Sequence, residues 1–421
     1  MSMQSPKPPT ARETRIALGL TAGLLLFVVV ASVVVVDPTG FDFSSIYAGA
    51  TIVRQGNGSK LYDSQEQARV QNQLFKWDHL FLDSHPPFEA LLFAPLTKLP
   101  YRQAYVLWGA INVLLWIWFQ RLLRPHAALP SHPFHYFMLC SLFFPLWAGL
   151  MQGQLSVVLL VLFSLAFVCL KRRQDFWGGS LLGFALFKGI FVIPFSLICL
   201  LRGKWRLMGG FAFGASVLTG LSIIAVGPSG LAAYMRVVTN TANHPSDPAY
   251  GTKFSAMPSV EGFITTLLSG TAGRLWITVA VGIVSGFLIL FTARRWRRLD
   301  RDGDEAASNG MFAAALVISL LVAPHMYVHN LTVMLLAVLL VLGFLQGSGR
   351  RAWRLVLMAS VVVLYAAPAY VLLLRWDEFY LFFPVLLAFA LAVLALARSV
   401  PPSEPIGQVD NEVRCEPGAA G

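Results

Sequence analysis

Long apolar stretches recur along the whole chain and are separated by short polar turns. Each stretch runs for roughly 15 to 20 residues, the length that an α-helix needs to cross the hydrocarbon core of a membrane. Clear examples are residues 16–36, 106–120, 155–170 and 355–374. The pattern predicts an all-α polytopic membrane protein.

The Lys and Arg residues gather in the turns between these stretches. The clusters lie at residues 7–15, 121–124, 171–173, 202–206, 294–301 and 350–354. Because basic residues concentrate in cytoplasmic loops, this spacing places both termini and every second turn in the cytoplasm.

One apolar stretch, residues 176–201, has a basic cluster at both ends. Its length of about 25 residues fits either one long span or two short ones. Pro194 and several glycines weaken a continuous helix, and two short helices satisfy the charge rule on both sides. We therefore expect a tight hairpin with Lys188 at its outer tip, within a bundle of about twelve transmembrane segments.

The expected transmembrane domain covers residues 16–397. A cytoplasmic tail precedes it at residues 1–15, and a disordered cytoplasmic tail that contains Cys415 follows it at residues 398–421. Two long external loops are expected, at residues 37–102 and 227–274.

The sequences of both expected external loops predict local structure. Residues 47–55 and 65–74 of the first loop have helical spacing, which predicts amphipathic helices along the membrane surface. The second loop contains His244-Pro245, Asp247-Pro248 and Met257-Pro258, which break regular structure and indicate a folded-over loop.

Composition supports the membrane assignment independently. The chain is 56% hydrophobic and 13% charged, a balance that a water-soluble globule of 421 residues does not accommodate. The net charge of +11 comes from the orienting clusters, so nucleic acid is not an expected partner. The cysteines Cys140, Cys169 and Cys199 lie in apolar stretches without paired spacing, which favours a packing role.

Polar residues that stand out in this apolar chain fall at one face of the membrane once the spans are drawn. They are Asp42, His85, Gln154, Lys188 and His325. Asp42 follows the first span among aromatic residues, where partial desolvation suits a general base, although a helix N-cap is an open alternative. A charged lysine in an apolar membrane segment, such as Lys188, has a high free-energy cost unless a partner compensates its charge. A lipid phosphate is one candidate partner, and snorkelling to the headgroups is the alternative.

Three short motifs indicate a binding site less specifically than Asp42 and Lys188 do. His85 precedes Pro86-Pro87, which fix the start of a helix and leave the histidine for a phosphate or sugar, or simply at the interface without a ligand. The Gln152-Gly153-Gln154 segment also reads as an ordinary turn. His325 and His329 share one helix face if a helix begins at Pro324, but no third zinc ligand is evident, so no metal is expected.

Taken in order, these motifs resemble those of the polyprenyl-phosphate-mannose-dependent glycosyltransferases of family 87, which have the GT-C membrane fold. The residues that carry the resemblance are Asp42-Phe43 with Tyr47, Gly56 through Leu61-Tyr62, Pro86-Pro87-Phe88 with Leu96, Gly153-Gln154, Lys188 and Pro324-His325. The resemblance extends from about Ile16 to Leu396.

The resemblance implies an inverting glycosyltransferase, mannosyl or related, that acts at the external face of the bacterial inner membrane. Its expected partners are a polyprenyl-phosphate-linked sugar donor, a glycan or glycolipid acceptor and membrane lipids, and no cofactor is expected. Asp42 would be the catalytic base. The donor phosphate would be bound by Lys188, His325 and His85, and the substrates also by Tyr47, Gln154, His329 and Asn330.

Two other classes of protein stay open at this point. Many apolar helices with a central lysine also suit a secondary transporter or lipid flippase, and a non-catalytic membrane assembly factor is a third possibility. Transporters commonly have repeated halves and a site at the membrane midplane. The absence of a repeat and the candidate site at one face favour the enzyme.

Overall fold

The computed structural model describes residues 11–35, 38–77, 79–126, 133–243, 253–299, 305–346 and 350–397. Within these ranges every regular element is helical and several helices are long and apolar enough to span a membrane, so the predicted all-α polytopic membrane fold is confirmed.

The α-helices follow one another along the chain as α1 (Ala11–Val35), α2 (Phe43–Arg54), α3 (Ser64–Phe75), α4 (Pro87–Phe93), α5 (Tyr101–Leu123), α6 (Pro133–Ser141), α7 (Phe144–Met151), α8 (Ser156–Lys171), α9 (Asp175–Phe184), α10 (Gly189–Leu201), α11 (Trp205–Asn243), α12 (Val260–Leu268), α13 (Arg274–Leu299), α14 (Glu305–Leu321), α15 (Met334–Val341), α16 (Arg351–Tyr365), α17 (Ala367–Arg375) and α18 (Phe383–Leu396). The 3₁₀ helices between them include η2 (Gly58–Lys60), η3 (Ala94–Lys98), η5 (Ala185–Lys188) and η8 (Val328–Val333).

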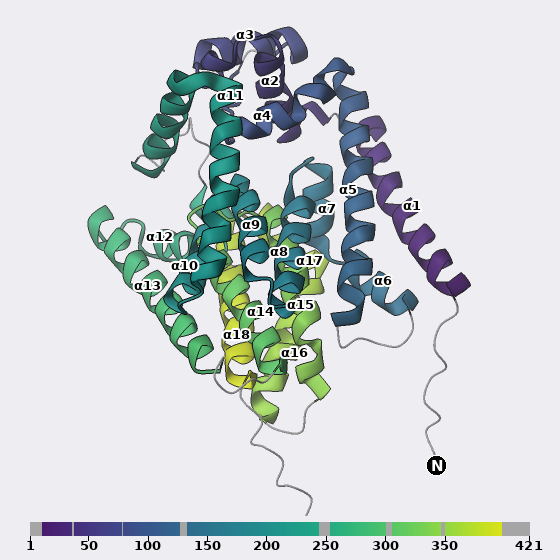
Figure 1. The fold of residues 1–421 in the computed structure, drawn as a ribbon, viewed down its shortest axis with the longest axis vertical. Helices are drawn as coiled ribbons and strands as arrows, with labels where there is room; N and C mark the ends of the chain where they lie inside the picture. The colour runs from purple at the N-terminus through teal and green to yellow at the C-terminus, as the bar shows by residue number, and fades with distance from the viewer. Residues whose placement is uncertain are drawn as a thin grey trace, which may run out of the picture.

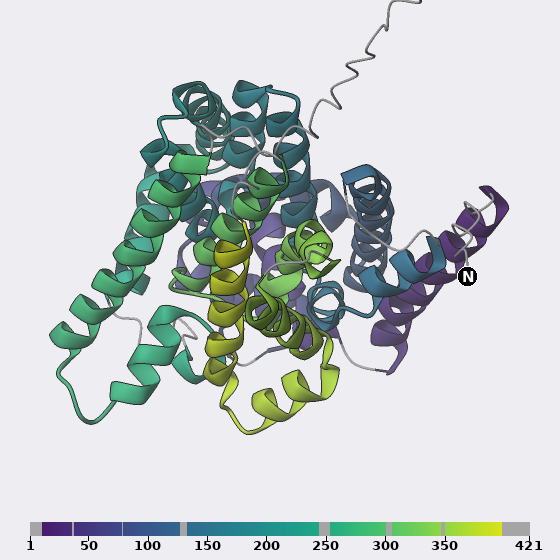
Figure 2. The same cartoon turned by 90° about the horizontal axis from the view of Figure 1, so that it is seen from below.

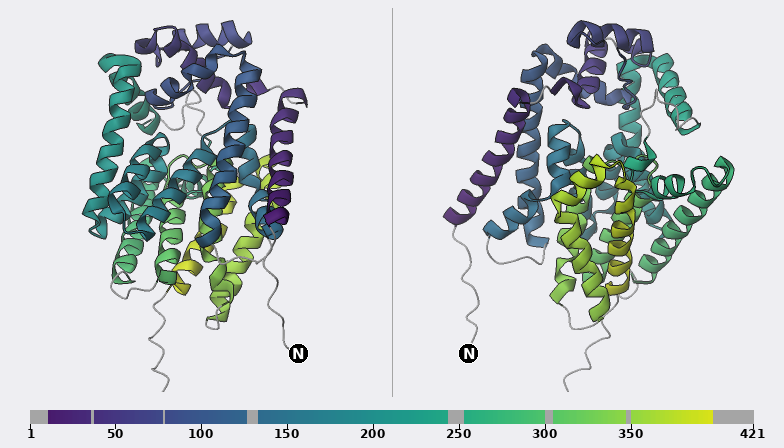
Figure 3. Two further views of the ribbon diagram at one scale, coloured as in Figure 1. Left: turned by 45° about the vertical axis from the view of Figure 1, so that its right-hand side comes forward. Right: turned by 180° about the vertical axis from the view of Figure 1, so that it is seen from behind.

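The helices form a bundle capped at one end by a layer that comprises α2, η2, α3, α4 and η3, which we call the cap layer (Figure 1). α1 and α5 run side by side along the bundle up to the cap layer, and α11 reaches it on the other side (Figures 1 and 3). Viewed from below, α1 and α13 lie at opposite edges, with α14 and α18 between them (Figure 2).

α11 connects the bundle to the cap layer. It breaks at Gly227, where φ is 69° and ψ is 176°, and Pro228 follows. α11 packs against α4 and η2, and a Cβ on Gly58 of η2 would meet the backbone carbonyl of Ala225, just before the break. The second external loop was expected to begin here, but its first part is helical. Met257-Pro258 precedes α12, whereas the other two proline motifs of this loop lie outside the described residues.

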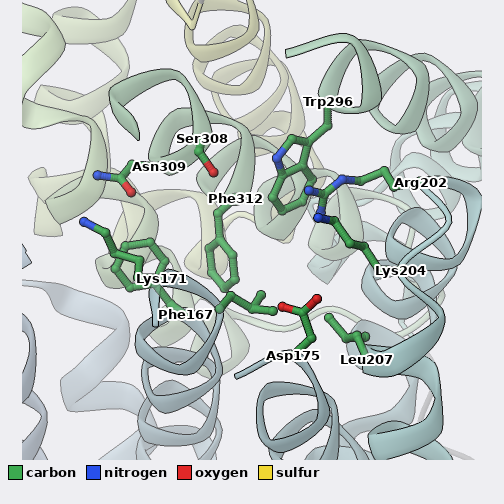
Figure 4. A pocket seen from close by; sticks show the side chains of 11 residues that line it. Phe167, Lys171, Asp175, Arg202, Lys204, Leu207, Trp296, Ser308, Asn309 and Phe312 are labelled. Carbon is green, nitrogen blue, oxygen red and sulfur yellow. The ribbon is translucent and has the colours of Figure 1, made fainter. Parts of the chain in front are cut away.

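The predicted hairpin is present. Asp175, at the start of α9, lines the same cavity as Arg202 and Lys204, which follow α10 (Figure 4). A straight helix would separate these ends by about 40 Å at 1.5 Å per residue. In addition, a Cβ on Gly179 of α9 would meet the backbone carbonyl of Leu207 in α11. The stretch from Asp175 to Leu201 is therefore folded back on itself, with η5 as its turn.

The basic clusters gather at the end of the bundle away from the cap layer. Lys171, Arg202 and Lys204 line one cavity of about 110 Å³ together with Trp296 (Figure 4). The guanidinium of Arg202 stacks on the indole of Trp296, with its Cζ 3.4 Å from the ring centroid. The structure thus brings together the clusters at residues 171–173 and 202–206, beside Trp296 of a third cluster, in agreement with the charge rule.

Length and composition alone identify six candidate spans among the described residues, or eight if two bent helix pairs each count as one. Three shorter apolar helices add to these. The expected number of about twelve segments is reached only when these shorter helices are included and the two arms of the hairpin are counted separately.

Two short helices were expected in the first external loop. The helix expected at residues 47–55 is present as α2, but residues Phe43 to Ile52 are buried, so α2 is a core helix of the cap layer rather than an interfacial one. The interfacial placement was wrong because α3, α4 and η3 all pack against α2. α3 matches the helix expected at residues 65–74 and has one buried face, with Gln67, Val70 and Gln71, and one exposed face.

The ends of the chain are described only in part. α1 begins at Ala11, within the expected tail, so the position where the chain enters the membrane stays a prediction. Residues 1–10 and the expected tail at 398–421, with Cys415, lie outside the described residues. Cys140 and Cys199 are buried and unbridged, in agreement with a packing role.

Candidate functional site

Two hydrogen bonds link three of the polar residues that stand out in the sequence. The Nε2 amide of Gln154 donates to Oδ2 of Asp42 at 2.6 Å, and Nζ of Lys188 donates to Oε1 of Gln154 at 3.1 Å. Gln154 is buried, whereas Asp42 and Lys188 keep part of their surface exposed. A carboxylate and an ammonium therefore lie on either side of one buried amide.

Asp42 precedes α2 but does not cap it. Its backbone is already helical, with φ −56° and ψ −29°, and its side chain makes no capping hydrogen bond to α2. An N-cap aspartate normally has extended backbone and accepts from the second or third amide of the helix. The N-cap alternative is therefore not the arrangement in this structure, in which the carboxylate turns to Gln154.

The turn between α7 and α8 places Gln154 beside Asp42. The backbone amide of Phe43 donates to the carbonyl of Gln152 at 3.0 Å, and the indole of Trp108 donates to the carbonyl of Gly153 at 2.8 Å. Gly153 has a φ of +66°, and a Cβ there would lie 2.6 Å from Cβ of Phe43. The close approach of α2 to this turn requires glycine at that position.

Lys188 ends η5 at the tip of the hairpin, where its backbone leaves the helical region with φ −119° and ψ 54°. The break lets the side chain point into the bundle toward Gln154. A snorkelling lysine would extend toward the headgroups instead. The inward hydrogen bond therefore favours a role in the site.

His85 belongs to a second group of titratable residues, in the cap layer. Its Nδ1 lies 2.8 Å from Oδ1 of Asp83, and its carbonyl accepts from the hydroxyl of Tyr62 at 2.5 Å. Asp83 is buried against α2 at Gly49, where a Cβ would meet its carboxylate. Burial lowers the pKa of His85, but the negative charges of Glu89 and Asp83 outweigh that effect and raise it.

Glu89 lies one turn into α4, which begins at Pro87 as the two prolines predict. Its side chain is only 1% exposed, and neither carboxylate oxygen has a hydrogen-bond partner among the described residues. Burial raises the pKa of Glu89 to about 7, against the opposing fields of His85 and Lys188. Such a group is partly protonated near neutral pH.

The segment after α14 differs from the expectation. The chain is irregular from residue 322 to Tyr327, which is extended, and η8 begins only at Val328. His325 and His329 therefore do not share a helix face, and the predicted i, i+4 pair was wrong. No helix starts at Pro324 because the chain turns and bends through residues 322–325 and is extended at Tyr327.

The residues of this segment have different environments. His329 and Asn330 are 5% and 3% exposed, and Nδ1 of His329 and Oδ1 of Asn330 have no partner among the described residues. η8, which contains His329, packs against α7 and α8, the two helices on either side of Gln154. No hydrogen bond between described residues joins His325 to Asp42, Gln154 or Lys188, and burial lowers the pKa of His325.

Tyr47 has a structural role in this arrangement. Its hydroxyl donates to the carbonyl of Leu99 at 2.7 Å, and its ring packs edge-on against Tyr101, with centroids 5.3 Å apart. These contacts hold α2 against the start of α5. The structure does not bring the hydroxyl of Tyr47 to Asp42.

Sequence reasoning missed Asp83, Glu89 and Tyr327. Asp83 and Glu89 flank His85-Pro86-Pro87, so a concentration of titratable residues around two prolines at a membrane surface was the available signal. Tyr327 lies within the field of Asp42 and stands between the two histidines already noted. The described ranges contain no group of three side chains that could hold a metal ion, and a metal-free reaction stays a prediction.

Comparison with known proteins identifies the family. A family model described as glycosyltransferase family 87 matches residues 81–324, more than half of the chain. This chain belongs to glycosyltransferase family 87. No curated protein and no solved structure matches it.

Membership of family 87 confirms the resemblance and makes this protein a glycosyltransferase. The family 87 match contains His85, Glu89, Gln154 and Lys188, whereas Asp42 precedes it and His325 follows it. The structure therefore adds Asp42 to the site by geometry, through its hydrogen bond to Gln154.

Proposed function

We propose that this protein transfers a sugar, with inversion, from a polyprenyl-phosphate-linked donor to an acceptor hydroxyl at the external face of the bacterial inner membrane. The sugar is mannosyl or a related hexosyl group, and the acceptor is a glycan or glycolipid. The observation that carries the proposal is the Asp42–Gln154–Lys188 arrangement, which holds a base and a cation beside each other next to the cap layer.

Asp42 is the proposed base. Its Oδ2 accepts from Gln154, while Oδ1 makes no hydrogen bond among the described residues and the side chain is partly exposed. Oδ1 takes the proton of the acceptor hydroxyl as that oxygen attacks the anomeric carbon. Because the base and the leaving group act on opposite faces of the sugar, the anomeric configuration inverts.

The phosphate leaves as the bond between the anomeric carbon and its oxygen breaks. Lys188 and His85 stabilise the charge that develops on it, and His325 is a further candidate. Each fixed donor in such a site contributes about 3 kcal/mol. Gln154 sets the spacing between base and cation, and the unpartnered polar atoms of His329 and Asn330 suit hydroxyls of the sugar.

Transfer from a defined donor tests the proposal. Purified protein in nanodiscs receives radiolabelled polyprenyl-phosphate mannose together with extracted bacterial membrane lipids, and a labelled glycolipid is the expected product. Transfer from a nucleotide sugar, but not from the lipid-linked donor, would contradict the proposed donor. Movement of labelled lipid between leaflets without any product would support a flippase instead.

A further inference from the structure

Glu89 is a buried carboxylate that the proposed reaction does not use. Both of its oxygens are shielded from solvent and lack a hydrogen-bond partner among the described residues. A buried ionised carboxylate without hydrogen bonds is costly, and it persists only beside compensating charge or in the neutral form. The surroundings of Glu89 therefore determine what it does.

Several elements present titratable groups to Glu89. They are Asp83 and His85 from the segment before α4, Lys188 from the hairpin tip, Tyr62 from the segment after η2, and Tyr234 from α11. Only His85 and Lys188 can be positively charged. Asp42, which precedes α2, acts on Lys188 from the other side, through Gln154.

The two cations that face Glu89 are the same two that the proposed function gives to the donor phosphate. An incoming phosphodiester and the Glu89 carboxylate would therefore compete for one pair of positive charges. Two anions so close in a poorly solvated site repel each other, and the carboxyl group can relieve the repulsion by protonation. The phosphodiester cannot relieve the repulsion in this way, because it stays ionised near neutral pH.

We propose that Glu89 is the resident counter-charge of the donor phosphate subsite, and that it takes up one proton when the phosphodiester binds beside Lys188 and His85. The proton comes from water and returns to water when the product leaves. Glu89 is thus a positioning residue: it balances the positive charges of Lys188 and His85 in the empty site and becomes neutral in the occupied one. The inference rests on the proposed lipid-phosphate donor.

The sign of the pH effect follows from linkage. In the empty site the pKa of Glu89 is about 7, and the bound phosphate raises it further. Below pH 7 Glu89 is already protonated, so donor affinity does not depend on it. Above pH 7 Glu89 must take up a proton each time the donor binds. Donor affinity therefore falls by up to about tenfold for each pH unit. Deprotonation of His85 weakens binding in the same direction, so a variant must separate the two groups.

The experiment measures binding of a short-chain polyprenyl-phosphoryl sugar, without acceptor, between pH 6 and pH 9. Glu89→Gln keeps the shape of the side chain but neither charges nor titrates. It should bind as tightly as wild type at pH 6 and roughly tenfold more tightly at pH 8.5, because one linked proton is missing. The control Glu66→Gln changes a partly buried carboxylate that pairs with Arg69 in α3, away from the proposed subsite, and it should follow wild type at every pH.

Other results would contradict the inference. A Glu89→Gln affinity that runs parallel to wild type over the whole range means that Glu89 does not titrate on binding. Equal weakening at pH 6 and pH 8.5 would indicate a purely structural role. If wild type does not bind the probe at any pH, the proposed donor fails, and this inference fails with it.

A second measurement keeps the inference testable if Glu89→Gln does not fold. Calorimetry of donor binding in two buffers with different ionisation enthalpies counts the protons taken up. In His85→Asn, which removes the imidazole, uptake near pH 8 should still approach one proton. No uptake in this variant would overturn the role of Glu89.

Discussion

At the scale of single residues, the side chain of Gln154 links the other two polar residues of the site. Its amide N–H donates to Oδ2 of Asp42, and its carbonyl oxygen accepts from Nζ of Lys188. Removal of either partner would leave the buried amide unsatisfied, at a cost of about 1 to 3 kcal/mol. The three residues therefore act as one unit.

Loss of the ammonium tests the phosphate subsite. Lys188→Ala should reduce transfer by roughly 10²- to 10³-fold, since the leaving phosphate loses a fixed positive donor. Lys188→Arg should restore only part of the rate, because the guanidinium keeps the charge but not the geometry. The rate of sugar transfer in nanodiscs gives the answer. Lys98→Ala, which removes an exposed lysine of the cap layer, is the matched control and should keep wild-type turnover. Normal turnover by Lys188→Ala would return Lys188 to a snorkelling role.

At the scale of elements, the site depends on two turns and one helix start. The turn at Gly153 brings Gln154 to the start of α2, and η5 brings Lys188 to the same point. Basic residues on both sides of the 176–201 stretch were enough to predict the hairpin, because membrane orientation depends on local charge. The predicted pairing of His325 with His329 failed, because sequence spacing does not show where a helix starts when the preceding chain is extended.

Substitution of Gly153 tests the contact between α2 and this turn. Gly153→Ala should destabilise the protein by roughly 1 to 3 kcal/mol and reduce transfer, because a Cβ would displace Phe43 and with it Asp42. Gly56→Ala is the matched control. Gly56 also has a positive φ, of +81°, but a Cβ there meets nothing within 4 Å. The melting temperature and transfer rate of both variants decide the matter, and equal effects would mean that the approach of Phe43 is unimportant.

At the scale of the whole molecule, the cap layer and the basic clusters lie at opposite ends of the bundle. The number and charge of the apolar segments predicted this division. The burial of Glu89 was not predictable in the same way, because it depends on α11 returning to α4 from a distant part of the chain. The burial of α2 likewise arises from the packing of its neighbours rather than from its own sequence.

Cysteine labelling tests the orientation of the bundle. In a background without the native cysteines, Ser64→Cys in the cap layer should react with a membrane-impermeant reagent added outside intact cells. Trp205→Cys, at the start of α11 beside the basic cluster, should be protected until the membrane is opened. Both positions are exposed, so accessibility reports the side of the membrane. External labelling of Trp205→Cys would invert the proposed topology.

The rate of sugar transfer by Asp42→Asn, measured beside its affinity for the lipid-linked donor, tests the central claim most directly. Asn keeps nearly the same shape and still accepts a hydrogen bond from Gln154, but it cannot take the acceptor proton. Transfer should fall by roughly 10²- to 10⁴-fold while donor affinity stays near wild type. Asp63→Asn is the control, because Asp63 caps α3 and Asn caps helices equally well. Near-normal turnover by Asp42→Asn would contradict the assignment of Asp42 as the base.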